Sequence, residues 1–297
     1  MNYTITHNLT NLTKGNITLT IQAEVGYQLP SSISVSNGTL VSYDSTTGVA
    51  VINGDDTTIV NVVCEAQAVV DPVLANNDWA TIKSVCQSGN AGNYWAVGDT
   101  KNVTGGDNAV RPVMIVDMQG LYSKHVVFQF RYRTEQNYVW QGSANDGNYY
   151  NNYNLATIRT TINSGGNAYT EMIPNDLGSE LTDTTVKVAK NGGDGTLVDV
   201  TDKLFLPAEK EVWTSRKYSR TEEFTALTTF QYYTTHTSNS DHMIPRPSAV
   251  GQTSGNVWWL RSPCSDYSNG VCGVNSSGGA SNYDADDSRG VAPCFAF

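Results

Sequence analysis

The sequence predicts an α+β protein of two domains, in which a small all-β domain precedes a larger domain of mixed strands and short helices. Three observations lead to this prediction. The chain of 297 residues is longer than a usual single domain. Residues 1–66 place short runs of Thr, Val and Ile between turns, a pattern typical of strands. Residues 78–297 mix short apolar runs, short helical stripes and long polar loops.

The first domain is expected to be a small β-sandwich, because its short strands follow one another closely. Turn sequences such as Asn37-Gly38 and Asn53-Gly54-Asp55 separate the strands. The expected strands are Tyr3 to Ile5, Ile17 to Ile21, Ile33 to Val35, Leu40 to Tyr43, Val49 to Ile52 and Thr58 to Val63. The stretch Gly26 to Gly54 resembles the bacterial Ig-like domains appended to surface and tail proteins, which implies a spacer or attachment module.

Residues 67–77 are expected to be a linker, since they carry a proline between two differently patterned regions. Asp78 then suits the N-cap of a helix that ends near Gly89. The helix would bury Trp79, Ile82, Val85 and Cys86, which follow helical spacing. The apolar runs Val110 to Met118 and His125 to Tyr132 predict two strands of a hairpin.

The middle of the larger domain is less regular. Leu155, Ile158 and Ile162 predict a helix, and residues 164–201 are expected to form loops with brief helical turns. Pro207 suits the first position of another helix, with Glu209 in its first turn. A further helical stripe is expected in residues 221–233, formed by Phe224, Leu227 and Tyr232 or by Phe230 and Tyr233.

Two apolar strands, Val257 to Pro263 and Gly290 to Phe297, are expected on either side of an unusual polar stretch. Residues 264–288 consist almost entirely of Ser, Gly, Asn, Asp, Tyr, Ala, Cys and Val, and they lack Lys, Glu, Gln, Met and Trp. Tyrosine with small polar residues is typical of recognition surfaces. The missing residue types also fit Asn or Tyr codons whose adenines are randomised. An ordinary Ser/Gly/Asn loop is the alternative interpretation.

Short sequences in this part of the chain resemble a known family. In order they read WWLRSP, VNSSGGASN and GVAPCFAF, and residues 78–103, 153–163 and 202–213 add further matches. They resemble the variable proteins of diversity-generating retroelements, in the phage and gut-bacterial branch whose C-type-lectin-like fold is related to that of the formylglycine-generating enzyme. The resemblance covers about residues 76–297. It implies a C-type-lectin-like ligand-display domain over residues 78–297, a variable region at about 264–294, and a binding protein that is not an enzyme.

The resemblance implies one set of residues that contact the ligand and another that supports them. The expected contact residues are Cys264, Ser265, Asp266, Tyr267, Ser268, Asn269, Cys272, Ser276, Ser277, Asn282, Tyr283, Asp284, Asp286 and Asp287. The expected scaffold residues are Trp258, Trp259, Arg261, Gly290 and Phe295. Because adjacent strand residues face opposite sides, one tryptophan should lie in the core and the other should brace the surface. Arg261 could hold a loop carbonyl or a carboxylate.

Composition and charge narrow the range of partners. The formal net charge is −10, with 15% charged residues, which argues against nucleic acid as a partner. No apolar run approaches the roughly 20 residues that span a bilayer, and the N-terminal residues lack the pattern of a signal peptide. The expected partner is a protein or glycan on a host or neighbouring cell surface, with the protein itself on a phage tail or bacterial surface. A homotrimer would suit a fibre tip.

An enzyme on the same fold is one alternative function. Cys264, Cys272 and Cys294 lie near the same end of the chain, and formylglycine-generating enzymes use a cysteine pair. Reactive thiols need a cationic setting, for which Arg261 and Arg289 are the candidates in sequence. Three of the five cysteines would then be catalytic residues or metal ligands, although their spacing is not typical of zinc sites.

Metal-dependent binding is the other alternative. Asp284, Asp286 and Asp287 could bind calcium, as in a carbohydrate-binding lectin, but no complete EF-hand ligand set follows them. His236, Asp241 and His242 lie close together in sequence without helical metal-ligand spacing. The sequence therefore favours a binding protein without a cofactor or metal, and leaves both alternatives open.

Overall fold

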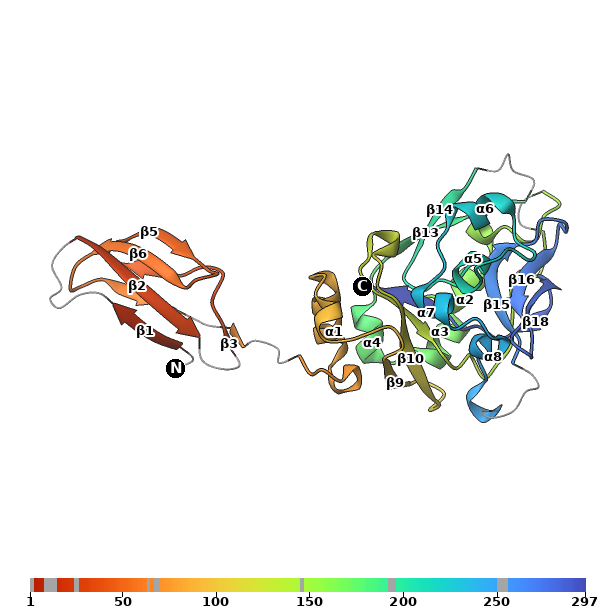
Figure 1. Ribbon diagram of the computed structural model, residues 1–297, viewed down its shortest axis with the longest axis horizontal. Coiled ribbons are helices and arrows are strands. Elements are labelled where there is room, and N and C mark those ends of the chain that lie inside the picture. Colours follow the sequence, from red (N-terminus) through yellow and green to blue (C-terminus); the bar gives the residue numbers. More distant parts are fainter. Residues whose placement is uncertain are drawn as a thin grey trace. The chain divides into compact units, whose positions relative to one another are not determined.

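The protein is described here by a computed structural model that covers residues 3–7, 15–23, 27–62, 65–66, 70–144, 147–191, 196–249 and 256–297. The chain divides into two compact units, Met1–Val70 and Asp71–Phe297. Both contain small antiparallel sheets, and the described helices are short and lie in the second unit (Figure 1). The protein is therefore a mixed α/β protein, compatible with the α+β class. None of the helices in these ranges is long and apolar enough to cross a membrane.

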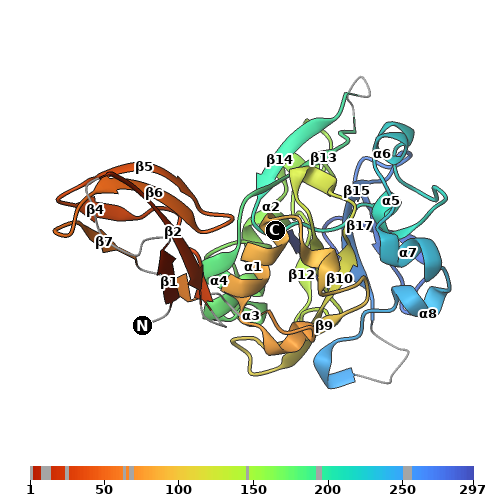
Figure 2. The ribbon, with the colours of Figure 1, turned by 60° about the vertical axis from the view of Figure 1, so that its left-hand side comes forward.

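The described part of the first unit is built from strands (Figure 2). They are β1 (Tyr3–His7), β2 (Gly15–Ala23), β3 (Tyr27–Gln28), β4 (Ser34–Ser36), β5 (Thr39–Asp44), β6 (Val49–Gly54), β7 (Ile59–Asn61) and β8 (Glu65–Ala66). One sheet has the order β1-β2-β6-β5, and β4-β7 and β3-β8 form two-stranded sheets. Each of the six predicted strands overlaps a described strand, and the very short β3 and β8 were not predicted. Val63, at the end of the last predicted run, lies outside the described residues.

The core of the first unit follows from the alternation of its strand residues. Ile17, Leu19 and Ile21 are buried at every second position of β2, and Ala50 and Ile52 of β6 are buried beside them. Side chains of the β4–β7 sheet also pack against this core. Side chains on one strand face project to the same side, so a period of two is what one buried face requires.

The predicted linker is wrong over most of its length, because residues 71–77 are packed within the second unit. Leu74, in the 3-10 turn η1 (Leu74–Asn76), is buried, and so is Asn77. The Asn77 side chain accepts the Asp71 N–H at 2.9 Å and donates to the Val73 carbonyl at 3.0 Å. Trp95 Nε1 also donates to the Asp71 carbonyl. Residues 67–69 of the predicted linker lie outside the described residues.

The second unit begins with the predicted helix, α1 (Trp79–Gln87). Asp78 caps it by accepting the Thr81 N–H at 2.7 Å, and Gly89 past its end adopts the left-handed φ of +74° that glycine tolerates. The apolar stripe of α1 is buried as predicted: Trp79, Ile82, Val85 and Cys86. Local capping and periodicity therefore determine this helix.

A four-stranded sheet carries the predicted hairpin and also the C-terminal strand. Its order is β19-β11-β10-β9, with β9 (Thr100–Thr104), β10 (Val110–Asp117), β11 (Val127–Phe130) and β19 (Cys294–Ala296). Phe295 of β19 stacks on Phe128 of β11, with ring centroids 5.1 Å apart. The end of the sequence is thus held in the centre of the second unit.

Short helices and turns connect the remaining strands. The helices are α2 (Thr157–Ile162), α3 (Asn167–Met172), α4 (Asn175–Glu180), α5 (Glu209–Val212), α6 (Thr221–Ala226), α7 (Gln231–Thr235) and α8 (Asn239–His242). The 3-10 turns are η2 (Ala91–Asn93), η3 (Leu121–Ser123), η4 (Tyr153–Leu155) and η5 (Pro247–Ala249). The remaining strands are β12 (Tyr138–Val139), β13 (Thr184–Val188), β14 (Val198–Asp202), β15 (Trp258–Pro263), β16 (Gly270–Val274), β17 (Ala280–Asp284) and β18 (Ser288–Arg289).

Several expectations for the middle region are corrected. Residues 164–201 contain the antiparallel hairpin β13–β14 as well as the expected helical turns. Leu155 precedes α2 and is exposed, so it is not part of the buried helical face. Pro207 precedes the N-cap of α5 instead of starting the helix. The Pro207 carbonyl accepts the N–H of Arg261 in β15 at 3.0 Å, so Pro207 is bonded to this strand and does not begin the helix.

The helix predicted for residues 221–233 is broken into α6 and α7. Residues 227–230 separate the two helices, and Phe224 is only half-buried. The fully buried position of α6 is Glu223, whose carboxylate accepts the Ala189 N–H at 2.9 Å and the Ser262 hydroxyl. A long-range polar contact has therefore replaced the apolar periodicity that predicted the helix.

Candidate functional site

The candidate site is the C-terminal three-stranded sheet β15-β16-β17 with its loops. Every residue of β15 and β16 is buried, whereas β17 is half-exposed and ends in the exposed Asp284. In Figure 1, β15 and β16 lie side by side in the second unit. The sheet therefore passes from a buried strand to a strand at the surface. We call residues 264–270 the C-terminal loop, and β16, its turn at residues 275–279 and β17 the C-terminal hairpin.

Most residues expected to contact a ligand lie at the surface of this sheet. Tyr267 is 56% exposed, the largest value among these positions for a large apolar side chain. The exposed positions are Asp266, Tyr267, Ser268, Ser277, Asp284 and Asp286, and the half-exposed ones are Ser265, Asn269, Ser276, Asn282, Tyr283 and Asp287.

Cys264 and Cys272 are corrected, because both are 1% exposed and unable to contact a partner. Their sulfur atoms lie 3.8 Å apart beneath the C-terminal loop. Burial, followed by the contact with Cys264, raises the pKa of the Cys272 thiol well above its usual value of 9.0. A thiol held in its neutral form is a poor nucleophile and metal ligand. The pair therefore belongs to the supporting core.

The backbone of the C-terminal loop is held by two buried asparagines from elsewhere in the chain. Asn151 Nδ2 donates to the carbonyls of Tyr267 at 2.8 Å and Gly270 at 2.6 Å. Asn191 Nδ2 donates to the carbonyls of Cys264 at 2.8 Å and Tyr267 at 2.9 Å. These bonds use main-chain oxygens, which every residue type supplies. The loop conformation is thus fixed without its side chains at positions 265, 266, 268 and 269.

Asn191 is itself held by a neighbouring amide. Its N–H donates to Asn152 Oδ1 at 2.7 Å, and Asn152 Nδ2 donates to the Asn191 carbonyl at 3.3 Å. All three asparagines are at least 96% buried, with exposed fractions of 0% for Asn151 and Asn152 and 4% for Asn191. Buried amides are costly to leave unpaired, so these contacts favour one loop geometry. No sequence pattern indicates this role, because isolated asparagines are ordinary loop residues.

Exchanging the loop side chains should therefore leave the fold stable. The variant Asp266→Ala/Tyr267→Ala/Ser268→Ala is expected to change the free energy of unfolding by less than about 0.5 kcal/mol per position. Asn191→Ala, which removes the donor to the Cys264 carbonyl and one of the two donors to the Tyr267 carbonyl, is expected to lower it by about 1–3 kcal/mol. Urea denaturation measures both changes. A triple variant less stable than Asn191→Ala would show that the loop depends on its side chains.

The turn of the C-terminal hairpin is built in a similar way. Asn275 Oδ1 accepts the N–H groups of Ser277 and Gly279, each at 3.0 Å, and the Asn275 carbonyl accepts the Gly278 N–H at 2.9 Å. Gly278 has a φ of +83°. These hydrogen bonds place Ser276 and Ser277 at the tip of the turn. None of them uses the Ser276 side chain.

Both scaffold tryptophans are fully buried. Trp258 Nε1 donates to the His242 carbonyl at 3.2 Å, and Trp259 Nε1 donates to the Tyr138 carbonyl at 2.9 Å. Trp259 nevertheless contacts the surface layer, because Tyr283 packs edge-on against it with centroids 5.9 Å apart. The guanidinium of Arg289 lies over the Tyr283 ring, with its central carbon 4.7 Å from the ring centroid.

Arg261 contacts both kinds of partner expected from its position. It is fully buried, donates to the Leu206 carbonyl at 2.8 Å, and forms a two-point ion pair with the equally buried Glu211, with Nη1 2.6 Å from Oε2. Burial disfavours its charged form, but the neighbouring Glu211 outweighs this and the pKa of Arg261 is raised. The hydroxyl of Tyr122 also donates to Glu211. This ion pair joins β15 to α5 in the core.

Gly290 and Phe295 complete the support. A Cβ atom at Gly290 would lie 2.1 Å from Cδ of the buried Arg133 side chain, so this position has no room for a larger residue. Phe295 packs in the aromatic core of the β19-β11-β10-β9 sheet. We refer to Trp258, Trp259, Arg261, Gly290 and Phe295 as the buried frame.

The cysteine, histidine and aspartate alternatives can be compared with the geometry. Cys294 is buried in β19, and burial raises the pKa of its thiol well above 9.0. Over the described ranges, no three His, Cys, Asp or Glu side chains come together in a way that could hold a metal ion. Asp287 is paired with Arg289 at 2.9 Å. His236 is exposed and stacks on Tyr232, whereas His242 is buried.

Acid should weaken the fold through His242. Burial lowers the pKa of His242 below its ordinary 6.5, and Arg131 acts in the same direction, while the Gly278 main chain and Asp241 oppose the shift. The pKa of His242 is lower in the folded state than in the unfolded state. The neutral ring therefore contributes its full share of the stability of the fold above pH 6.5, and this contribution is lost as the pH falls towards the folded-state pKa. Urea denaturation at stepped pH should give a flatter profile for His242→Gln than for the exposed control His236→Gln. Equal profiles would contradict this expectation.

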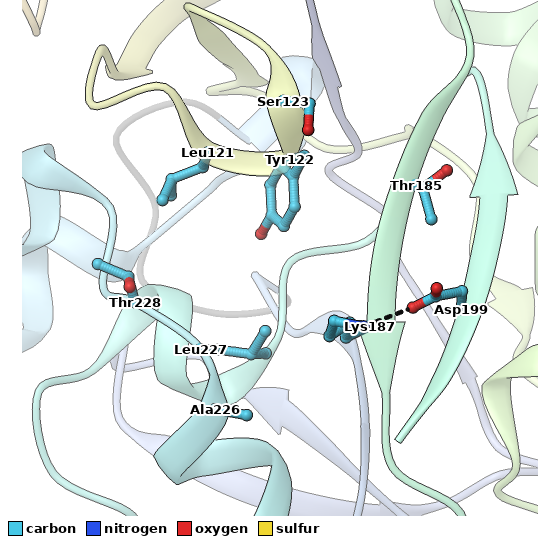
Figure 3. A pocket seen from close by; sticks show the side chains of 9 residues that line it. All are labelled: Leu121, Tyr122, Ser123, Thr185, Lys187, Asp199, Ala226, Leu227 and Thr228. Atoms are coloured by element: carbon cyan, nitrogen blue, oxygen red, sulfur yellow. Dashed lines mark hydrogen bonds and ion pairs between the residues drawn. The ribbon is translucent and has the colours of Figure 1, made fainter. Parts of the chain in front are cut away.

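One cavity lies apart from the C-terminal sheet (Figure 3). It has a volume of about 390 Å³, and its lining comes from η3, the β13–β14 hairpin and residues 226–228. Tyr122 and Ser123 in its wall have left-handed φ values of 57° and 58°. The charged lining residues, Lys187 and Asp199, pair with each other at 2.9 Å. The charges of this cavity are thus already satisfied.

A charged residue at the end of a strand is usually found at the surface. Asp117 at the end of β10 is instead fully buried. Its carboxylate accepts the N–H of Gln119 at 2.9 Å and the N–H of Gln231 at 3.1 Å. Glu135 is partly exposed and accepts the Ser248 N–H at 3.0 Å. Asp117 therefore joins β10 to α7, and it does not belong to a site at the surface.

The fold and site together define a class: a two-unit protein with small antiparallel sheets whose C-terminal loop and hairpin present polar side chains on a buried frame. Residues 123–297 match the family described as "Domain of unknown function (DUF6273)", and since this is more than half of the chain, the protein belongs to that family. The match begins in η3 and includes β15–β19. No significant match is found among the curated proteins or the solved structures.

Proposed function

We propose that the protein is a ligand-binding protein whose C-terminal loop and hairpin present exchangeable contact residues. The observation that carries this proposal is the support of the C-terminal loop through its main-chain carbonyls by buried Asn151 and Asn191. Such support tolerates different side chains at the surface while the backbone stays in place. Specificity can then change without loss of the fold.

The proposed contact surface is narrower than the set expected from sequence. It contains the twelve exposed or half-exposed positions described above and excludes Cys264 and Cys272. Tyr267 provides a large amphipathic contact area at its centre, and Ser, Asn and Asp side chains around it offer adaptable hydrogen bonds. A protein or glycan on a host or neighbouring cell surface is the partner class that this chemistry suits.

The finer fold assignment belongs to the same proposal. We assign the second unit to the C-type-lectin-like fold and the first unit to an Ig-like module that attaches it to a phage tail or a bacterial surface. Small antiparallel sheets, many loops and a C-terminal strand in the central sheet support the first assignment. Two strand layers with a shared apolar core support the second.

The enzyme alternative has less support. Its reactive residues would be Cys264, Cys272 and Cys294, all of which are buried. The pKa values of Cys272 and Cys294 are raised by burial, which disfavours the thiolate that nucleophilic or metal chemistry needs. None of the three cysteines lines the cavity of Figure 3.

The DNA beside the gene tests the proposed function. We expect a near-identical copy of the codons for residues 258–297 next to a reverse transcriptase gene. The two copies should differ at adenines, and the differences should fall in codons of exposed positions such as 266, 267 and 284, not in those of the buried frame. Differences spread equally over buried and exposed codons, or the lack of any such copy in the complete genome sequence, would contradict the proposal.

A further inference from the structure

Two segments from outside the proposed exchangeable stretch border the C-terminal loop. On one side, the Ser265 N–H donates to the Tyr218 carbonyl at 2.9 Å. On the other side, the Tyr150 N–H donates to the Ser268 carbonyl at 2.9 Å. Both bonds join main-chain atoms, which every residue type supplies. Tyr218 and Tyr150 therefore stay beside the loop whatever side chains it carries.

The main chain at Tyr218 is held from beneath by a buried carboxylate. The side chain of Glu209 is fully buried. Its oxygens accept the N–H groups of Lys217 at 2.8 Å, Tyr218 at 2.9 Å and Ser219 at 2.6 Å. The Glu209 N–H donates in turn to the Ser262 hydroxyl on β15 at 2.9 Å. Hydrogen bonds to a charged group are stronger than neutral ones, so this segment is fixed to β15 without use of the Tyr218 side chain.

The Tyr218 side chain is available to a partner. It is 38% exposed, and Tyr267 of the C-terminal loop is 56% exposed. Among the described residues, neither hydroxyl group has a hydrogen-bonding partner, and neither ring packs on another ring or on a cation. Tyrosine is enriched among the residues that dominate binding at interfaces, because it offers a large amphipathic area at a low cost in entropy. Two exposed tyrosines on a fixed main chain thus suit the centre of a contact surface.

The same surface contains an example of the side chain that such a tyrosine accepts. The central guanidinium carbon of Arg289 lies 4.7 Å from the centroid of the Tyr283 ring, and Nη2 of Arg289 pairs with Asp287 at 2.9 Å. An arginine can therefore stack on a tyrosine and pair with a carboxylate at the same time. This arrangement within the chain is a pattern for an arginine of a partner.

The C-terminal loop and the adjacent end of the hairpin carry carboxylates that have no such partner. Asp266, Asp284 and Asp286 are exposed, and no Lys or Arg of the described ranges forms an ion pair with them. Asp284 lies opposite Gly270 in the hairpin, so it belongs to the end of the hairpin where the loop finishes. Exposed tyrosine and free carboxylates repeat the surroundings of Arg289 in this place, without the arginine.

The charges next to Tyr218 have the opposite sign. Arg216 and Lys217 are exposed there, and Arg216 donates to the Ser219 carbonyl at 2.7 Å. A partner that meets both sides needs cations towards the aspartates and acceptors towards Arg216 and Lys217. A polypeptide offers both through its side chains and its carbonyl groups. A neutral glycan has no cation to offer the aspartates.

We propose that Tyr218 is a contact residue of the binding surface, placed beside the exchangeable Tyr267 but outside the exchangeable stretch. The partner of this chain is a polypeptide segment that presents Arg or Lys side chains. The inference rests on the proposed ligand-binding function and narrows its partner class. Tyr218 supplies binding energy common to many versions of the surface, while the loop residues decide which segment is bound.

Selection of peptides on the full wild-type chain tests the inference. The probe is a phage-displayed library of random linear peptides, and the enriched peptides are synthesised and titrated by calorimetry. We expect enrichment of Arg and Lys. Tyr218→Ala should weaken binding at least about tenfold, whereas Tyr218→Phe, which keeps the ring, should retain most of the affinity. Asp284→Asn/Asp286→Asn should weaken binding and make it less dependent on salt.

Tyr94→Ala is the matched control and should bind as the wild type does. Tyr94 is 42% exposed and follows α1, which lies at the opposite end of the second unit from β16 in Figure 1. Thermal unfolding shows whether each variant is folded. A loss of affinity in Tyr94→Ala as large as that in Tyr218→Ala would overturn the assignment of Tyr218.

The remaining outcomes separate this inference from the proposed function. The inference alone is overturned if binding needs Tyr267 but not Tyr218, or if the aspartate variant changes neither the affinity nor its salt dependence. It is also overturned if the enriched peptides are neutral or acidic, or if no peptide is enriched, whether or not the chain binds an array of glycans. Peptide binding that survives both Tyr218→Ala and Tyr267→Ala would overturn the inference and count against the proposed function.

Discussion

Replacing Arg261 with methionine is expected to lower the free energy of unfolding by about 3–5 kcal/mol, because it leaves a buried carboxylate without its counter-charge. Arg261 and Glu211 have no exposed side-chain area and share two hydrogen bonds. A second buried carboxyl group, Glu223, lies close enough to act on the pKa of Arg261. Methionine can fill the space, but it cannot donate to Glu211 or to the Leu206 carbonyl.

Two further variants distinguish the ion pair from simple loss of packing. Lys187→Met breaks a pair whose side chains are 57% and 59% exposed, and should change stability by no more than about 1 kcal/mol. Arg261→Met/Glu211→Leu removes both buried charges and should recover part of the loss. Recovery should be incomplete, because Glu211 also accepts the Ala208 N–H and the Tyr122 hydroxyl. Urea denaturation measures all three. A double variant no more stable than Arg261→Met would contradict the electrostatic explanation.

The position of this ion pair links stability to the proposed function. Arg261 lies on β15, the buried strand of the C-terminal sheet, and Glu211 lies on α5. The next residue, Ser262, donates to Glu223 and accepts the Glu209 N–H at 2.9 Å. Buried polar groups therefore fix β15 from one side, while the surface side of the sheet can change composition. A site that varies its contacts needs a support of this kind, in which the stabilising interactions avoid the variable residues.

Local sequence patterns predicted those parts of the fold that local interactions determine. Asp78 capping, the stripe of α1 and Gly89 are all contained within one helix and its ends. The same is true of the alternating residues in β2 and β6. Short-range periodicity and capping were enough in these places. The two apolar strands around residues 264–288 were found in the same way.

Long-range polar contacts account for most of the wrong expectations. In the helix that was predicted from an apolar stripe, the fully buried residue is Glu223, because its carboxylate accepts the Ala189 N–H and the Ser262 hydroxyl. Asp117 is buried and accepts the N–H of Gln231, which begins a helix 114 residues away in sequence. Periodicity reports which side chains are apolar, but it contains no information about a distant partner that makes a charged residue internal.

The candidate site was predictable in location but not in construction. Its unusual composition marked residues 264–288, and the described surface positions lie there. The supporting asparagines at 151 and 191 lie far away in sequence, in stretches that resemble ordinary loops. Cys264 and Cys272 are buried with their sulfur atoms 3.8 Å apart, a contact that no single-strand pattern encodes. These features follow from the three-dimensional packing alone.

Replacing Gly278 with alanine is expected to dislodge the C-terminal hairpin and to lower the free energy of unfolding by about 2–5 kcal/mol. Two causes add. The left-handed φ of +83° costs a non-glycine residue about 1–2 kcal/mol. The new Cβ would also lie 1.7 Å from the Asn239 carbonyl oxygen, so the turn or α8 must move, at a cost of about 1–3 kcal/mol for overpacking.

Gly279→Ala is the matched control, because it adds the same methyl group one residue later. Its Cβ would meet the Asn275 side chain at 3.0 Å, which is a milder contact, and Gly279 is not among the residues with positive φ. We expect a loss of no more than about 1 kcal/mol for this variant. The comparison also bears on function, since displacement of the turn moves Ser276 and Ser277. If the two variants are equally stable, the C-terminal hairpin is not held against α8. The proposed surface, whose backbone stays fixed while its side chains change, then lacks this support at its turn.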